Sequence, residues 1–114
     1  MLMAATAAVK ADLFRVLAHP TRVRVLELLQ TQERSSRDLQ ALLGLDSGAT
    51  SQHLSALRRQ GLVESRREGT SVIYNLVDAR VGQLLDLGRQ IISIRLTAQN
   101  AVLEELAAEG IVKP

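Results

Sequence analysis

The sequence predicts a mainly α fold with one small β-hairpin (α+β). Three observations carry this prediction. Apolar residues recur at helical spacing along most of the 114 residues, the spacing changes to two between residues 62 and 76, and a Gly-Thr pair divides that stretch. The length sets a prior of one domain, and no repeat, low-complexity tract or linker marks a boundary. We therefore expect a single domain over residues 1–114.

The first two helices are divided by a proline. Val9 and Leu13 belong to an apolar stripe on a helix that we place at residues 4–18. Pro20 restricts the residue before it and favours the first position of a helix, so a second helix runs from there to about residue 30. We expect Val23, Leu26 and Leu29 to form its buried line, with Arg22 and Arg24 outside.

A helix-turn-helix is predicted over residues 36–60. Ser35 or Ser36 can cap a short third helix at residues 37–43, and Gly44 supplies a left-handed stop. Asp46, an effective N-cap, then opens a fourth helix at residues 47–60 after a tight turn. The inward-pointing residues of the third helix are expected to be Leu39, Leu42 and Leu43.

The fourth helix has a buried side and a polar side. Thr50, Leu54 and Leu57 are spaced to face the core. The opposite side is polar and becomes basic towards its end: Ser47, Gly48, Ser51, Gln52, Ser55, Arg58 and Arg59. Short hydroxyl and amide side chains can approach base edges while arginines meet phosphates, so this side predicts contact with double-stranded DNA. Ser51 and Gln52 are the residues expected to read bases directly.

The hairpin follows at once and completes a winged helix over residues 62–76. Gly69 and Thr70 form its tip, and Arg66 and Arg67 lie on the outgoing strand, where a minor groove or a phosphate backbone could receive them. Residues 47–75 hold four bases and two acids, an excess equal to the +2 net charge of the whole chain. Charge alone would favour an ordinary solvated face, but here it coincides with the predicted recognition helix and wing.

The last third of the chain is strongly apolar. We expect residues 79–109 to form one helix, or two with a bend near Gly88, whose apolar residues cover about 200° of its circumference. Too little chain remains to cover that surface, so a two-fold dimer interface is predicted, made with the first helix. Its expected residues are Val9, Leu13, Leu84, Leu85, Gly88, Ile91 and Ile92.

The order of motifs resembles the ArsR/SmtB group of bacterial winged-helix repressors. The matching segments are residues 17–22 (Leu-Ala-His-Pro-Thr-Arg), 25–29, 51–54 (Ser-Gln-His-Leu), 57–63, 68–69 and 73–74. The resemblance covers about residues 13–77. It implies a homodimer that binds a palindromic operator, places one recognition helix per half-site in the major groove, and represses transcription until an effector releases it.

The chain departs from that group in its sensor residues. Metal-sensing members carry a Cys-x-Cys pair around the third helix, whereas this chain has no cysteine. Other members use His and acidic ligands on the last helix, but Asp86 is the only acid between residues 81 and 99 and no histidine follows His53. We therefore expect no metal, no cofactor and no thiol-based sensing.

The two histidines are expected to have structural or supporting roles. His19 precedes Pro20 and belongs to the connection, and the two rings are too far apart in sequence to make a zinc motif. His53 lies at the edge of the buried stripe, where packing or a phosphate contact is favoured over base readout. A small apolar effector could occupy a pocket lined by Leu87, Ile91 and Ile94 and be oriented by Gln90 or Arg95; a repressor without an effector is the alternative.

Other classes of function have little support. No nucleophile, base and acid occur in a recognisable order, and the glycines are scattered caps and turns, so we do not expect an enzyme. No apolar run approaches the roughly 20 residues that span a bilayer, and the start of the chain is a poor signal peptide, so no membrane contact and a cytoplasmic location are expected. The runner-up is a winged-helix protein–protein interaction module without specific DNA binding, which would use the apolar last helix.

Overall fold

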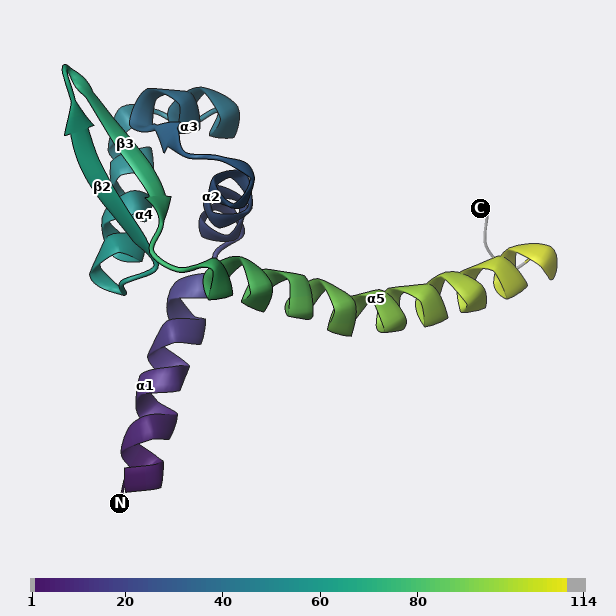
Figure 1. Ribbon diagram of the computed structural model, residues 1–114. Helices are drawn as coiled ribbons and strands as arrows, with labels where there is room; N and C mark the ends of the chain where they lie inside the picture. Colours follow the sequence, from purple (N-terminus) through teal and green to yellow (C-terminus); the bar gives the residue numbers. More distant parts are fainter. Residues whose placement is uncertain (1, 111–114) are drawn as a thin grey trace. The chain divides into compact units, whose positions relative to one another are not determined.

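The computed structural model describes residues 2–110 and confirms the predicted fold class (Figure 1). In chain order its elements are α1 (Leu2–Leu17), α2 (Pro20–Thr31), β1 (Arg34–Ser35), α3 (Ser36–Leu43), α4 (Ser47–Arg59), β2 (Val63–Glu68), β3 (Ser71–Leu76) and α5 (Ala79–Ala108). The chain divides into two compact units, Met1–Gly82 and Gln83–Pro114.

Local capping interactions fix the start and end of α3 and the start of α4. The Ser35 hydroxyl accepts a hydrogen bond from the Asp38 amide at 3.0 Å, so Ser35 is the cap of α3. Gly44 then adopts φ 66°, a left-handed conformation that favours glycine and ends the helix. At the start of α4, Oδ1 of Asp46 accepts from the Ala49 amide at 2.7 Å. The first turn of α4 is therefore held where the sequence predicted it.

The core lies among α2, α3, α4 and the start of β2. Its buried apolar residues are Val25, Leu26, Leu28, Leu29, Leu39, Leu54, Ala56, Leu57, Leu62 and Val63. Thr50 is buried with Leu54 and Leu57, as predicted, and its hydroxyl donates to the Asp46 carbonyl. Val23, expected in the buried line of α2, is only half-buried, and Val25 and Leu28 are buried instead. The four buried residues of α4, which include Ala56, turn its polar side outward.

Two further side chains lie opposite to their predicted positions. Leu42 was expected to point inward but is 54% exposed, because the core side of the eight-residue α3 runs along Leu39 and Leu43. Arg22 was expected outside but is half-buried, and its Nη1 donates to the carbonyl of Val16 at 3.4 Å. The long arginine side chain folds back over the end of α1, which a helical projection of α2 alone does not reveal.

The predicted hairpin is part of a three-stranded antiparallel sheet of order β1-β3-β2. On one side of β3, Arg34 pairs with Tyr74 and Ser35 with Ile73; on the other side, Arg66 pairs with Ile73. The stretch between the second and third predicted helices, for which the sequence predicted no strand, therefore contains β1. A two-residue strand is too short to leave a period in the sequence.

The last helix is continuous through Gly88, which settles the choice between one helix and two. At its start, Gly82 is buried against α2, and a Cβ atom there would lie 2.9 Å from the side chain of Gln30. Glycine at this position allows the first turn of α5 to approach α2 closely. Within the described residues, no helix has both the length and the apolar character needed to cross a membrane.

Candidate nucleic-acid interface

The exposed side of α4 carries the residues predicted to meet DNA. Ser55 is half-buried, and the others on this side are exposed: Ser47, Gly48, Ser51, Gln52, Arg58 and Arg59. The helix therefore presents neutral polar groups from its first two turns and two guanidinium groups from its last. Among the described residues, Arg59 has no ion-pair partner, which leaves its charge available to an anion.

A hollow of about 460 Å³ lies on this side of α4 and includes a residue that the sequence did not predict. It is lined by Arg22, Ser51, Gln52, Ser55 and Arg59. Arg22 comes from the first turn of α2, so arginines from two helices line the same hollow as Gln52. No local signal relates Arg22 to Gln52, because only the packing of α2 against α4 brings them together.

Arg22 is positioned by His53. Its Nε donates a hydrogen bond to Nδ1 of His53 at 3.2 Å, so His53 accepts at Nδ1 and is neutral. Burial of the ring, with smaller effects from the charges of Arg22 and His19, lowers the pKa of His53 below 6.5. The rings of His19 and His53 lie 6.2 Å apart despite their separation in sequence. The described residues nevertheless contain no group of three His, Cys, Asp or Glu side chains able to hold a metal.

Acidification is expected to destabilise the protein through His53. The native state favours the neutral ring, so the unfolded chain binds more protons as the pH falls from about 6.5 through the lowered pKa, and stability is lost over that window. The thermal midpoint should fall less steeply with pH in His53→Gln, whose side-chain carbonyl can accept from Arg22 without titrating. His19→Gln is the matched control and should keep most of the wild-type loss of stability on acidification, because it leaves in place the burial of the His53 ring, the largest cause of its lowered pKa. Identical pH profiles for the wild type and His53→Gln would contradict this assignment.

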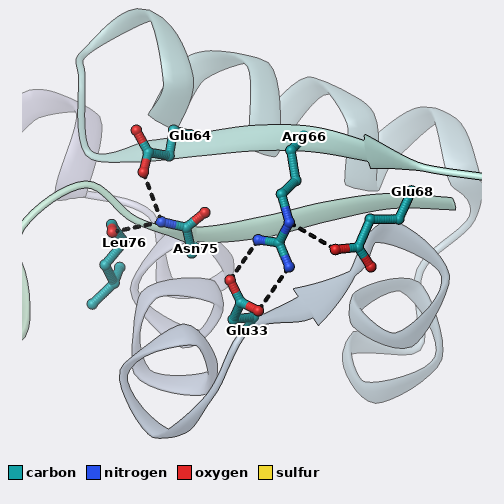
Figure 2. A network of polar contacts seen from close by, with 6 residues as sticks. All are labelled: Glu33, Glu64, Arg66, Glu68, Asn75 and Leu76. Carbon is teal, nitrogen blue, oxygen red and sulfur yellow. Dashed lines mark hydrogen bonds and ion pairs between the residues drawn. The ribbon is translucent and has the colours of Figure 1, made fainter.

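The wing places its two arginines on opposite faces of the sheet, because side chains alternate along a strand. Arg67 shares a face with the buried Val63 and with Ser65, whose hydroxyl oxygen accepts from Nη1 of Arg58 at 3.4 Å. Arg66 lies on the other face, where its guanidinium binds two carboxylates (Figure 2). The tip is made by Gly69 at φ 61° together with Thr70.

The face of the wing that carries Arg67 adjoins the start of α4. A second hollow, of about 280 Å³, lies between them and is lined by Ser36, Gln40, Ser47, Thr50, Ser51, Leu54, Val72 and Tyr74. Val72 is the cross-strand partner of Arg67. The predicted contacts of α4 and those on this face of the wing therefore belong to one continuous surface of the first unit.

The second unit is a helix without internal cover. Every residue from 87 to 105 is exposed, including Ile91 at 72% and Ile94 at 76%. Of the other residues predicted at a dimer interface, Leu84 and Leu85 are half-buried, and Gly88 and Ile92 are exposed. On α1, Val9 is exposed and Leu13 is half-buried. Both terminal helices thus leave apolar side chains in contact with solvent in the single chain.

A helix-turn-helix with an outward polar and basic second helix, followed by a hairpin wing, defines a winged helix-turn-helix transcriptional regulator. Residues 19–65 match the family described as "Bacterial regulatory protein, arsR family". The chain is 42% identical over 102 residues to the "Uncharacterized HTH-type transcriptional regulator Rv0081" of Mycobacterium tuberculosis, which covers 89% of this chain and 90% of that protein. The chain belongs to the ArsR family, whose members are transcriptional regulators and not enzymes.

Solved structures show the same architecture. The crystal structure of Rv0081 superposes with a TM-score of 0.79 at 38% identity, over 82% of this chain and 95% of that one. The solution structure of the homodimeric winged helix-turn-helix DNA-binding domain of Mb0332 from Mycobacterium bovis superposes with a TM-score of 0.73 at 32% identity, over 79% of this chain and 83% of that one. Among the sequence relatives, a probable mercury resistance operon repressor of Streptomyces lividans is 38% identical over 79 residues, 69% of this chain and 63% of that protein.

Proposed function

We propose that this chain is a homodimeric repressor that binds a palindromic operator through α4 and the β2–β3 wing. The observation that carries the proposal is the outward side of α4, which is polar in its first turns, basic in its last, and held outward by four buried residues. Protein side chains of these kinds read base edges and bind phosphates. The proposed contacts are Ser47, Gly48, Ser51, Gln52, Ser55, Arg58, Arg59, Arg67, Gly69 and Thr70, with Arg22 added.

His53 and Arg66, which the sequence also suggested, take indirect roles in this proposal. His53 lies behind the exposed side of α4 and orients Arg22, whose guanidinium borders the hollow beside Gln52. Arg66 is bound to carboxylates of the same chain, and its role is the subject of the further inference.

The proposed dimer interface combines Val9 and Leu13 of α1 with Leu84, Leu85, Gly88, Ile91 and Ile92 of α5. Apolar side chains exposed in such number are unusual for a monomer of this size and favour burial against a second copy. The homodimeric Mb0332 domain supports this arrangement. Two copies of α4 would then meet half-sites about one turn of DNA, roughly 34–36 Å, apart.

We infer a sensor that does not use thiolates. The sequence contains no cysteine, so neither thiolate metal ligands nor thiol oxidation can operate in these 114 residues. An apolar hollow of about 450 Å³ on α5 is lined by Arg95, Ala98, Gln99, Val102 and Leu103, next to the segment where the sequence predicted an effector pocket. A small apolar molecule oriented by Arg95 would fit this chemistry, and a repressor without an effector is the alternative.

Selection of bound duplexes from a random pool by the purified chain tests the proposal. We expect an enriched inverted repeat whose affinity falls steeply with salt, as phosphate contacts require. Transcription from a promoter overlapping that repeat should fall when the protein is added; a rise would make the protein an activator. No enriched sequence and no salt-dependent binding would favour the protein–protein module instead. Release of the operator by a stoichiometric divalent metal would overturn the expectation that the sensor uses no metal.

A further inference from the structure

We propose that Arg66 is a positioning residue that fastens the wing to the connection after α2, and that Arg67 makes the phosphate contact of the wing. The proposal rests on the DNA-binding function proposed above and assigns different roles to two adjacent arginines. It also gives Glu33, which lies outside the helix-turn-helix and the wing, a part in shaping the interface.

All three guanidinium nitrogens of Arg66 donate hydrogen bonds within the chain (Figure 2). Its Nη1 and Nη2 donate to the two oxygens of Glu33 at 2.5 and 2.8 Å, and its Nε donates to Glu68 at 2.9 Å. The fork-like pairing with Glu33 has the geometry in which an arginine–carboxylate pair is strongest. A phosphate would have to displace both carboxylates to gain the same donors.

The pair spans the sheet. Glu33 immediately precedes β1, which is hydrogen-bonded to β3, whereas Arg66 lies on β2 at the other edge. The side chain of Arg66 therefore crosses β3 to reach Glu33, as Figure 2 shows. This contact fixes the tilt of the hairpin relative to the end of α2, because it joins the two outer strands through one rigid planar group.

Charge separates the two faces of the wing. The face of Arg66 also carries Glu64 and Glu68, and Glu33 reaches it from the connection, so three carboxylates and one guanidinium share this face. Asn75 on β3 lies on the same face and donates a hydrogen bond to Glu64. A phosphate backbone is repelled there.

The opposite face has the charge that DNA requires. It carries Arg67 and Ser65, and Ser65 contacts Arg58 of α4. Arg67 is exposed and has no hydrogen-bond or ion-pair partner among the described residues. Its cross-strand partner Val72 lines the hollow beside Ser47 and Ser51 of α4. The free guanidinium thus lies on the side of the wing that adjoins the recognition helix.

The salt dependence of binding to a duplex of random sequence distinguishes the two arginines. The logarithm of the binding constant falls as the logarithm of the salt concentration rises, and each lost phosphate contact lowers the magnitude of this slope by about one. All slopes below are given as magnitudes. We expect Arg67→Gln to lower the slope by about one, and Arg66→Gln to leave it unchanged. Arg80→Gln, which removes an exposed arginine paired with Asp78 outside the interface, is the matched control and should leave the slope unchanged.

A second variant keeps the test decisive if Arg66→Gln loosens the wing. In the double variant Glu33→Gln/Glu68→Gln, Arg66 is released, and we expect the slope to rise by up to about one; adding Arg66→Gln should cancel that rise. Equal slope losses in Arg66→Gln and Arg67→Gln would overturn the division of roles, as would a double variant that binds like the wild type.

Proton exchange at Nε of Arg66 in the free wild-type protein, measured by NMR, tests the contact of Arg66 with Glu33 and Glu68 without DNA. We expect slow exchange. A wild type without salt-dependent binding would overturn the proposed function and the role of Arg67, while the NMR result would still decide the fastening.

Discussion

Replacing Ile91 by arginine is expected to convert the protein from a dimer to a monomer and to weaken operator binding by about 100-fold or more. Ile91 is 72% exposed in the single chain, so a monomer should accommodate the charge without loss of fold. At a dimer interface the same guanidinium would be buried without a partner, which is strongly unfavourable. Loss of the dimer removes the linkage of two half-site contacts, and such linkage contributes on the order of 10²–10⁴ in affinity.

Sedimentation equilibrium at micromolar concentration measures the first effect, and a titration of the selected operator measures the second. The matched control is Ser93→Arg on the polar side of α5, where the exposed hydroxyl only donates to the carbonyl of Gln90. We expect this control to remain dimeric. A wild type that sediments as a monomer, or an Ile91→Arg variant that remains a dimer, would remove α5 from the interface.

Replacing Gln52 by alanine is expected to cost about 1–3 kcal/mol of binding free energy at the operator, with little change on random duplex. Gln52 is exposed on the outward side of α4, and its carboxamide can donate to and accept from the same adenine. Arg22 and Arg59 border the same hollow, so phosphates held there would set the depth to which Gln52 enters the groove.

Paired titrations of the operator and of a random duplex provide the measurement. Ser55→Ala on the same helix is the control, because Ser55 is half-buried and its short side chain has a smaller reach; we expect a weaker effect there. Equal losses of affinity on both duplexes would assign Gln52 to general electrostatic or structural support and remove it from base readout.

The sequence was sufficient to predict the recognition helix because its signals are local. Asp46 caps the start of α4, and the spacing of Thr50, Leu54 and Leu57 decides which side is buried. The hairpin followed from the change of period and from the glycine at its tip. These features depend on residues close together in the chain, where capping and periodicity act.

What the sequence did not predict depends on tertiary contacts. The strand β1 has two residues and no period of its own, and its partner Tyr74 lies 40 positions along the chain. Arg22 reaches His53 across 31 residues, and Glu33 reaches Arg66 across 33. Alternation along β2 could have separated Arg66 from Arg67, but the carboxylate that binds Arg66 comes from a connection that carried no structural signal.

Both elements proposed to contact DNA are attached to the same helix, α2. Near its start, α2 holds α4 through Arg22 and His53; just past its end, Glu33 holds the wing through Arg66. The first turn of α5 rests on α2 as well, with Gly82 against Gln30. The recognition helix and the wing are thus tied to opposite ends of α2, in addition to their direct contact through Arg58 and Ser65. A displacement of α2 would therefore disturb the recognition helix and the wing together.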